Sequence, residues 1–187
     1  ISTSMKNNDL SRKAVFLYGK SSLGNKLALL TQRGTWAVLV YRFGRFAGNV
    51  SPRPLGLFLK VIYFGFFYIT QMLTGISIQA YANIGKGMVV MNFSGIFVLA
   101  EKIGDNFTVY EGVTVGNIRG APRLAIIGDN VTLEPGCKIL GDVTIGNNVV
   151  VRANSLVLTD IPDNSVAMGN PARIKPLESL QPAETQG

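Results

Sequence analysis

The sequence predicts a mainly β protein: a parallel β-helix built from six-residue repeats, preceded by an α-helical extension. The main observation is a branched aliphatic residue at every sixth position, at Ile127, Leu133, Ile139, Ile145, Val151 and Val157. Gly, Asn and Asp cluster directly after these positions, as in Ile127-Gly128-Asp129-Asn130. A six-residue period matches neither a helix of 3.6 residues per turn nor an alternating strand. It fits short strands joined by turns in a solenoid.

The period extends towards the N-terminus with two interruptions. An earlier run comprises Ile78, Ile84, Val90 and Ile96, and after one extra residue it continues with Ile103, Val109 and Val115. Residues 116–123 have the Gly, Asn and Pro content of a loop, so we expect a loop that leaves the coil and returns in register. A β-sandwich with evenly spaced turns is the alternative, but sandwich strands do not keep a strict six-residue stride.

The interior of the coil leaves a second trace in the sequence. Four residues after each aliphatic, the side chain is mostly small or β-branched, as crowding inside a narrow coil requires. These positions are Ala82, Ser94, Ala100, Val113, Val131, Cys137, Val143, Val149 and Ser155.

The composition bears on which kinds of site to expect. The chain has 187 residues, 47% of them hydrophobic, with one cysteine and no histidine. A single cysteine excludes an intramolecular disulfide framework. Without histidine or a second cysteine the sequence offers no metal-ligand cluster, so we expect no metal cofactor. Cys137 falls where a small apolar side chain fits the repeat, which favours a buried structural thiol.

The charge is unevenly distributed. Residues 1–100 contain eleven Lys and Arg and one acid, a net charge of +10, whereas residues 101–187 carry seven bases and ten acids. A basic N-terminal half predicts an anionic surface as partner. The basic residues stand among large apolar side chains and not in a polar basic stripe, so we expect an anionic membrane surface and no nucleic acid.

Two N-terminal segments show this combination. In residues 35–46, Arg42 and Arg45 lie off a helical face formed by Trp36, Leu39, Val40, Phe43 and Phe46. A basic amphipathic helix of this kind can lie in a membrane interface. Residues 55–73 follow two prolines and carry Lys60 as their only charge, which brings them near the lower length of a transmembrane span.

Three interpretations of residues 55–73 stay open. Lys60, the glycines and the aromatic residues favour a helix at the interface or packed against another subunit. A true span and an ordinary buried helix are the alternatives. The chain then divides into a polar tail (1–20), a basic and apolar helical region (21–75), the β-helix (76–177) and a C-terminal tail (178–187).

Several stretches of the β-helix region match a known pattern. They are Ile84-Gly85-Lys86-Gly87, Gly112-Val113-Thr114-Val115-Gly116, Ile127-Gly128-Asp129-Asn130 and Gly169-Asn170-Pro171-Ala172-Arg173-Ile174. With them the chain resembles the hexapeptide-repeat acyltransferases, most closely the serine acetyltransferase-like branch. Residues 36–45 are similar to the leader of members found with polysaccharide-assembly enzymes. The resemblance implies a left-handed parallel β-helix, a homotrimer, and acetyl-coenzyme A bound in the groove between neighbouring subunits.

The resemblance also implies a general base, which in serine acetyltransferases is a histidine oriented by an aspartate. The histidine position falls on Asn92, and the neighbouring substrate-binding aspartate falls on Met91. The orienting aspartate falls on Ser77, and a second histidine falls on Leu124. An amide cannot accept a proton at neutral pH, so the catalytic candidates are Asn92, which could orient an acceptor or an oxyanion, and Glu111, the best substitute base. A turn amide and a solvated carboxylate are the plainer interpretations of these two.

The coenzyme side of the implied groove is better preserved. A pantetheine arm requires backbone donors and small side chains along the coil edge, and Gly116, Cys137 and Ala153 match such positions. Phosphate groups require cations. The candidates near the C-terminal end and on the loop are Arg152, Arg173, Lys175, Arg119 and Arg123, each of which could also be an ordinary surface charge.

Together these observations lead to one functional expectation and one alternative. The leading expectation is acetyl transfer from acetyl-coenzyme A to a hydroxyl of a sugar or lipid-linked intermediate in surface-polysaccharide assembly. The protein would be a cytoplasmic homotrimer, peripheral on the inner face of the cell membrane, with polysaccharide-assembly enzymes as possible partners. The alternative is a catalytically silent relative that binds a partner or the coenzyme and serves as scaffold or regulator. Acetylation of free serine fits least, because Met91 and Asn92 replace the residues that would hold and activate serine.

Overall fold

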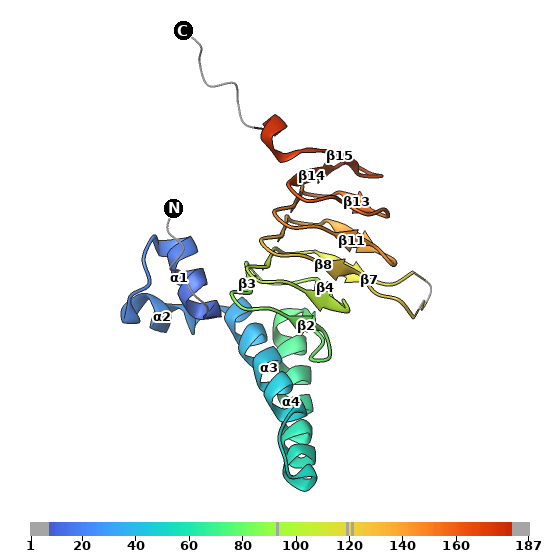
Figure 1. Ribbon diagram of the computed structural model, residues 1–187. Coiled ribbons are helices and arrows are strands. Elements are labelled where there is room, and N and C mark those ends of the chain that lie inside the picture. Colours follow the sequence, from blue (N-terminus) through green and yellow to red (C-terminus); the bar gives the residue numbers. More distant parts are fainter. Residues whose placement is uncertain (1–7, 93, 119, 121, 181–187) are drawn as a thin grey trace.

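The computed structural model describes residues 8–92, 94–118, 120 and 122–180, and it shows a solenoid of short strands with helices at its N-terminal end (Figure 1). Each turn of the solenoid contributes to three sheets. Sheet A contains β1 (Ile76–Ile78), β4 (Ile96–Val98), β7 (Thr114–Gly116), β10 (Lys138–Leu140) and β13 (Leu156–Val157). Sheet B contains β2 (Asn83–Ile84), β5 (Lys102–Ile103), β8 (Ile126–Ile127) and β11 (Thr144–Ile145).

Sheet C completes each coil and also ends the solenoid. It contains β3 (Val89–Val90), β6 (Thr108–Val109), β9 (Thr132–Leu133), β12 (Val150–Val151), β14 (Ser165–Met168) and β15 (Arg173–Pro176). Neighbouring strands pair in parallel until β15, which turns back antiparallel on β14. A short 3₁₀ helix, η1 (Leu177–Leu180), follows. The predicted parallel β-helix with an N-terminal helical region is thereby confirmed.

The six-residue stride corresponds to the core of the solenoid. Ile127, Leu133, Ile139, Ile145, Val151 and Val157 are all buried in one hydrophobic cluster. Ile103 pairs with Ile127 in sheet B, so the loop between β7 and β8 does return in register as expected. Inward-facing aliphatics from successive coils therefore stack into a continuous core, as in other repeat proteins.

One expectation about the repeat frame was wrong. The periodicity placed Ile96 at the repeat position, with one extra residue after it. In the structure Ile96 pairs with Ile76, and Val98 pairs with Ile78, so Val98 holds the repeat position. Val98 follows Val90 by eight residues and precedes Ile103 by five, so the extra length lies before β4, and Ser94 in that stretch is exposed instead of facing inward. Both Ile96 and Val98 are buried, so the aliphatic pattern alone could not distinguish them.

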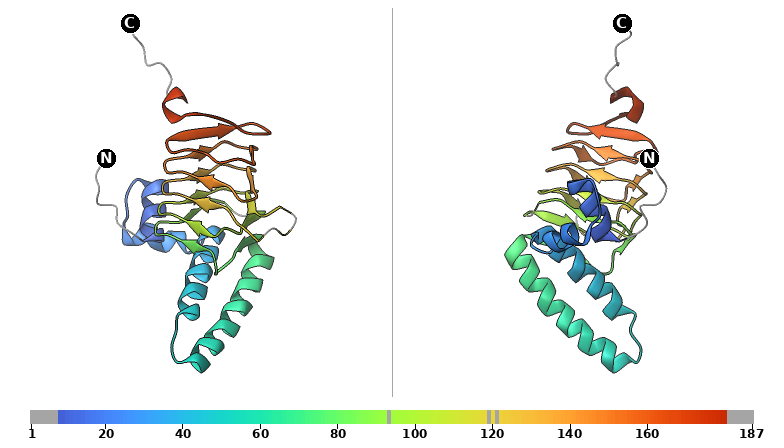
Figure 2. Two further views of the ribbon diagram at one scale, coloured as in Figure 1. Left: turned by 45° about the vertical axis from the view of Figure 1, so that its right-hand side comes forward. Right: turned by 90° about the vertical axis from the view of Figure 1, so that its left-hand side faces the viewer.

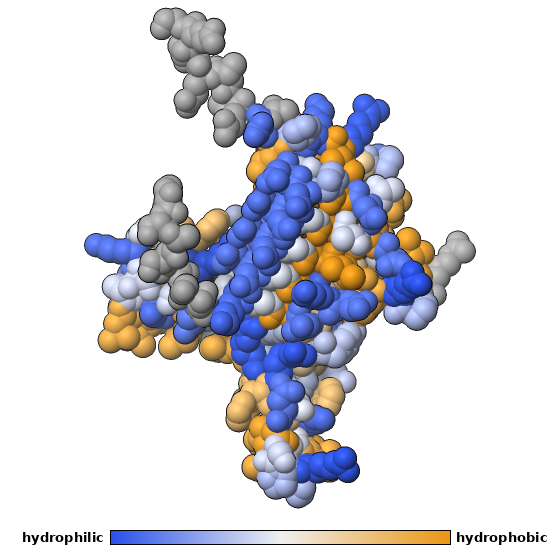
Figure 3. Space-filling model, in the orientation of Figure 1, coloured by the Kyte–Doolittle hydropathy of each residue, from blue (hydrophilic) through white to orange (hydrophobic). Residues whose placement is uncertain are grey.

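The asparagines that follow the aliphatics have a structural role at the turns from sheet B to sheet C. Asn106, Asn130, Asn148 and Asn164 have φ angles of 59°, 57°, 55° and 53°. Asn tolerates this left-handed conformation better than most residues. The side-chain amides of the first three each donate to the next Asn Oδ1 along the column, at 2.9 Å, and Asn164 accepts the last of these bonds. A continuous hydrophilic stripe runs along the stacked coils (Figure 3).

Four helices precede the strands in the described part of the chain. They are α1 (Asp9–Tyr18), α2 (Leu23–Leu29), α3 (Arg33–Gly48) and α4 (Arg53–Thr74). Helices α3 and α4 form a hairpin that projects away from the solenoid (Figure 2). The helices touch closely at Gly44, where an added Cβ would lie 2.4 Å from the Tyr63 ring. Helix α4 ends at Gly75, which adopts a left-handed φ of 66°.

The apolar face predicted for residues 35–46 is only partly outward: Val40 and Phe43 are half-buried, and Phe43 contacts Phe66 of α4. Trp36, Leu39 and Phe46 are exposed, whereas Ala37, Val38 and Tyr41 pack into the core cluster of the first coil. Helix α4 is the one helix of the described residues that is long and apolar enough to cross a membrane by length and composition. Ten of its large apolar side chains are exposed: Leu55, Leu57, Phe58, Val61, Phe64, Phe66, Tyr68, Ile69, Met72 and Leu73.

The expected polar tail at residues 1–20 contains helix α1, which packs against the first coil. Asp9 forms a two-pronged ion pair with Arg42 of α3, with contacts of 2.8 and 3.0 Å, and its Oδ1 also accepts from the Met88 backbone N–H. Arg42 donates in addition to the Ile84 carbonyl oxygen at 2.8 Å. These long-range partners order a segment whose own sequence is polar.

Tyr41 links α3 to the edge of the first coil. Its hydroxyl donates to the Ala82 carbonyl oxygen at 2.8 Å and accepts from the Ile84 backbone N–H at 2.9 Å, and the side chain is 1% exposed. Buried backbone groups left without a partner destabilise a fold by about 1–3 kcal/mol. The ring fills the core while the hydroxyl satisfies two backbone groups.

We expect Tyr41→Phe to lower the free energy of unfolding by about 1–3 kcal/mol, because it leaves one backbone donor and one acceptor unpaired. Denaturant unfolding would measure the change. Tyr81→Phe is the matched control, since Tyr81 is 60% exposed; it should change stability by less than about 0.5 kcal/mol. Equal effects of the two substitutions would contradict this role for Tyr41.

Candidate functional site

The site begins at the long turn between β3 and β4. Asn92 lies in this turn, is exposed, and has a left-handed φ of 57°. Its Nδ2 donates to Oε2 of Glu111 at 2.8 Å. Glu111 occupies the equivalent turn of the next coil, between β6 and β7, and is partly exposed. The structure therefore brings together the two catalytic candidates, as an amide held against a carboxylate.

Helix α3 begins directly beside this turn. A Cβ added at Gly34 would lie 2.7 Å from the Val90 carbonyl oxygen and 3.0 Å from that of Asn92. Any side chain here would push the helix away from β3. The absence of a side chain at Gly34 thus allows the N-terminal turn of α3 to rest on the backbone of Asn92.

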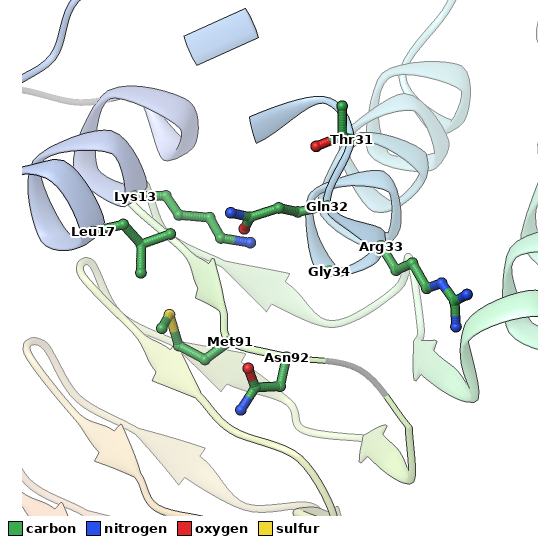
Figure 4. Close-up of a pocket in the computed structure, with 8 residues that line it drawn as sticks. All are labelled: Lys13, Leu17, Thr31, Gln32, Arg33, Gly34, Met91 and Asn92. Carbon is green, nitrogen blue, oxygen red and sulfur yellow. The ribbon is translucent and has the colours of Figure 1, made fainter. Parts of the chain in front are cut away.

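A cavity of about 380 Å³ opens at this junction (Figure 4). The residues that line it come from α1, from the start of α3 and from the turn after β3: Lys13, Leu17, Thr31, Gln32, Arg33, Gly34, Met91 and Asn92. Two of them are cationic, and none of these described residues is acidic. Its size suits a small metabolite or the terminal part of a larger one.

Lys13 is the buried charge of this cavity. The residue is 4% exposed, and among the described residues its ammonium has one hydrogen-bond acceptor, Thr35 Oγ1 at 3.2 Å. Burial disfavours the charged form and lowers the pKa of Lys13 to about 8. A lysine in this range changes its charge near physiological pH.

Of the other positions implied by the resemblance, Met91 adjoins Asn92, whereas Ser77 and Leu124 lie elsewhere in the coil. Ser77 is buried on β1, where it pairs with Phe97 of β4. Met91 lines the cavity beside Asn92. Leu124 lies before β8, after the loop that links sheets A and B, whereas Asn92 lies between sheets C and A. The two turns therefore lie at different corners of the coil.

The pantetheine candidates divide into outer and inner positions. Gly116 lies on β7 opposite Leu140 of β10. Ala153 is exposed, and its backbone N–H already donates to Glu134 Oε2 at 3.0 Å. The Cys137 side chain is fully buried, and burial raises the pKa of its thiol to about 12. Any contact of Cys137 with a coenzyme would therefore come from its backbone.

The cationic candidates fall into two groups. Arg152 forms an ion pair of 2.8 Å with Glu134, and its backbone N–H donates to Ala167. Arg173 and Lys175 lie on β15, where Arg173 pairs with Met168, the residue after Ala167. Arg152, directly after β12, and the two bases on β15 therefore lie on either side of β14 at the C-terminal end of sheet C.

On the loop, Arg123 forms an exposed ion pair of 3.2 Å with Asp142. Arg119 lies outside the described residues. Among the residues that the structure does describe, no group of three or more Cys, Asp or Glu side chains is arranged to hold a metal ion.

Sequence reasoning missed the N-terminal wall of the cavity. The segments that contain Lys13, Gln32 and Arg33 carry no six-residue repeat. Lys13 shares the cavity with Met91 and Asn92, which are more than 75 positions away in the sequence. The apolar run Ala14-Val15-Phe16-Leu17 after Lys13 gave no usable signal, because four consecutive apolar residues do not mark one helical face. In the structure Phe16 and Leu17 are exposed, whereas Ala14 is buried.

Comparisons with known proteins agree with the repeat fold. Residues 125–159 match the family model "Bacterial transferase hexapeptide (six repeats)". A serine acetyltransferase from Staphylococcus xylosus is 42% identical over 111 residues, which cover 57% of this chain and 50% of that protein.

Two solved structures extend the likeness to the helices. The serine acetyltransferase of Neisseria gonorrhoeae in complex with serine is 27% identical, with a TM-score of 0.70 over 88% of this chain and 66% of that one. A serine acetyltransferase in complex with CoA is 27% identical, with a TM-score of 0.72 over 89% of this chain and 67% of that one. The chain spans about half the length of the curated relatives that it matches. Residues 125–159 thus match bacterial transferase hexapeptide repeats, and the chain as a whole is similar to serine acetyltransferases.

Proposed function

We propose that this protein transfers an acetyl group from acetyl-coenzyme A to a hydroxyl of an acceptor. The observation that carries the proposal is the fold-wide likeness to serine acetyltransferases, including one in complex with CoA. The Asn92–Glu111 pair supports it, because the pair lies at the turn where the resemblance places the catalytic residue. The chain's coenzyme contacts would come from the strand edges and the bases Arg152, Arg173 and Lys175.

The chemistry is nucleophilic attack of the acceptor oxygen on the thioester carbonyl carbon. Glu111 accepts the hydroxyl proton as the new C–O bond forms, and the C–S bond then breaks. The proton passes on to the departing thiolate, so that free coenzyme A and the acetyl ester are the products. Asn92 holds the Glu111 carboxylate through the 2.8 Å hydrogen bond, which leaves Oε1 as the oxygen to face the acceptor.

Two acceptor classes follow from different observations. The names of the relatives favour serine. Met91 and the cationic cavity favour another hydroxyl compound, because no acidic side chain among the described lining residues would pair with the ammonium of serine. We propose a sugar or lipid-linked intermediate of surface-polysaccharide assembly as the first acceptor to test and serine as the second. A protein that binds the coenzyme without turnover would act instead as a scaffold or regulator of that assembly.

Glu111→Gln should reduce acetyl transfer by roughly 10²–10⁴, the usual contribution of general-base assistance. Release of coenzyme A can be followed with sugar acceptors and with serine. Coenzyme binding should survive both Glu111→Gln and Asn92→Ala. Glu101→Gln, at an exposed position outside the site, is the matched control.

The outcomes separate the alternatives. Full turnover in Glu111→Gln removes Glu111 as the base. Binding of acetyl-coenzyme A without transfer to any acceptor leaves the scaffold interpretation. Failure of the wild-type protein to bind acetyl-coenzyme A removes the enzyme proposal.

We also propose that the working form is a homotrimer with the coenzyme groove between subunits. The solenoid alone leaves apolar side chains on its outer faces, at Phe97, Ile118, Ile126 and Leu158. Burying such side chains is favourable by about 25 cal/mol per Å² of apolar surface. A symmetric oligomer provides that burial and would bring turns from different chains together.

Light scattering should give a mass of about 60 kDa, three times the 20.1 kDa chain, at micromolar concentration. Leu158→Asp should weaken the assembly, because it places a charge on an apolar contact surface. Thr159→Asp, next to it in sequence, is the control. A monomer mass for the wild-type protein contradicts both the trimer and an intersubunit coenzyme site.

We further propose that the α3–α4 hairpin attaches the protein to the inner, cytoplasmic face of the cell membrane. Its exposed side includes Phe58 and Met72, which are 62% and 87% exposed, together with Arg53 and Lys60. Hydrophobic side chains show on the surface of the projecting hairpin in Figure 3. Apolar insertion and attraction to anionic lipid then act together.

Vesicles that contain anionic lipid should bind the protein more tightly than neutral vesicles. Phe58→Ser with Met72→Ser should release it, since both side chains are exposed and their loss costs the fold little. Arg53→Gln with Lys60→Gln should reduce the lipid charge preference by about 1 kcal/mol per residue. Equal binding to both kinds of vesicle would refute the electrostatic part of the proposal.

A further inference from the structure

The cavity beside Asn92 combines positive charge, burial and position. We infer that it binds an anionic group, a carboxylate or a phosphate, carried by the hydroxyl acceptor, with Lys13 as its principal partner. The assignment of this ligand as the acceptor rests on the proposed acetyl transfer. The anion site itself stands on the geometry of the cavity.

The first step is the incomplete pairing of Lys13. An ammonium has three N–H donors, and among the described residues Thr35 Oγ1 is the one acceptor. The neighbouring acid on α1, Asp9, is engaged by Arg42 and by the Met88 N–H. A buried charge without an acidic partner is unfavourable, and a bound anion offsets that cost.

Most of the charges around Lys13 are positive. The charged residues on the elements packed around Lys13 are Lys26 on α2, Arg33, Arg42 and Arg45 on α3, and Asp9 and Arg12 on α1. Strand β3 contributes no charge. Arg33 lines the cavity, whereas Arg12 donates to Gly87, Phe107 and Thr108 on the first two coils. Basic residues therefore outnumber acidic ones here, and the two nearby acids already have partners: Asp9 pairs with Arg42, and Glu111 accepts from Asn92.

The second step is the start of helix α3. Its N-cap residue, Gln32, makes no side-chain capping hydrogen bond, and no acidic residue lies in the first turn. The N-terminal end of a 16-residue helix carries a partial positive charge. This end points into the same cavity as Lys13 (Figure 4). Helix and ammonium thus favour an anion from two directions.

The third step is that the cavity adjoins the two catalytic candidates. Gly34, on the cavity wall, lies against the Asn92 backbone, and Asn92 holds Glu111. An anionic group placed at Lys13 leaves the remainder of a small molecule at the Asn92–Glu111 pair. Met91 adds an apolar wall where the resemblance places a substrate-binding aspartate. The cavity would therefore select an anionic hydroxyl compound and disfavour one that presents an ammonium group here.

Calorimetric titration with three probes tests the site. Glycerol 3-phosphate and D-glycerate carry a hydroxyl beside a phosphate or a carboxylate, and glycerol carries no charge. At pH 7 we expect one or both anions to bind and glycerol not to bind. Lys13→Met should weaken anion binding roughly 10- to 100-fold, the usual effect of removing a hydrogen bond to a charged group. Lys20→Met, an exposed lysine just after α1, should leave it unchanged.

A second measurement uses the wild-type protein alone. Because the pKa of Lys13 is about 8, anion binding should weaken as the pH rises from 7 to 9 and the amine loses its charge. At pH 8.5 binding should take up protons, because the anion raises the pKa of the amine while the phosphate is already fully ionised. Calorimetry in buffers of different ionisation enthalpy detects this uptake.

Two results would overturn the inference: no binding of either anion to the wild-type protein, or equal anion binding by wild-type and folded Lys13→Met protein. Phosphate-only or carboxylate-only binding identifies which anion the acceptor carries. The assay contains no acetyl-coenzyme A. Anion binding without any acetyl transfer would therefore contradict the proposed function and leave the anion site in place.

Discussion

The whole structure depends on the need to cover the open end of the first coil. In a solenoid each coil buries its aliphatics against the coils above and below, so the first coil lacks one neighbour. Here Ala37, Val38 and Tyr41 of α3 supply the missing contacts and join the same hydrophobic cluster as Ile76 and Ile84. Because α3 must sit on this end, its N-terminal turn comes to rest against the turn that holds Asn92. The capping requirement therefore also builds the wall of the candidate site.

The sequence predicted the repeated coils, but it did not predict the contacts that the N-terminal helices make with the first coil. The stride from Ile127 to Val157 allowed the coil to be predicted, since each repeat reports the same inward position. The repeat position was assigned wrongly at one coil, because Ile96 and Val98, two residues apart, are both buried aliphatic residues. Asn92 and Glu111 could be paired because neighbouring coils align equivalent turns. Lys13 could not be placed, because its surroundings arise from segments with no shared period.

The chemistry of the site must differ from that of an imidazole base. An Asn92 amide carries no proton-accepting group at neutral pH, so it can only orient its neighbour. In the proposed mechanism Glu111 is the base, and the hydrogen bond from Asn92 fixes one of its oxygens. A carboxylate is a weaker base than imidazole, and catalysis by such a pair relies more on how the acceptor is held. The cavity must therefore select and orient the acceptor.

The buried Lys13 is consistent with such a role of the cavity in binding the acceptor. A side chain that is 4% exposed and paired with one hydroxyl costs stability compared with an apolar residue of the same size. Local choices that oppose stability are characteristic of functional sites, where ligand binding compensates for them. The cost at Lys13 falls beside Asn92 and at the positive end of α3, and nowhere along the repeat. The energetic penalty and the candidate chemistry therefore share one location, which is the arrangement expected if the cavity holds the charged part of the acceptor.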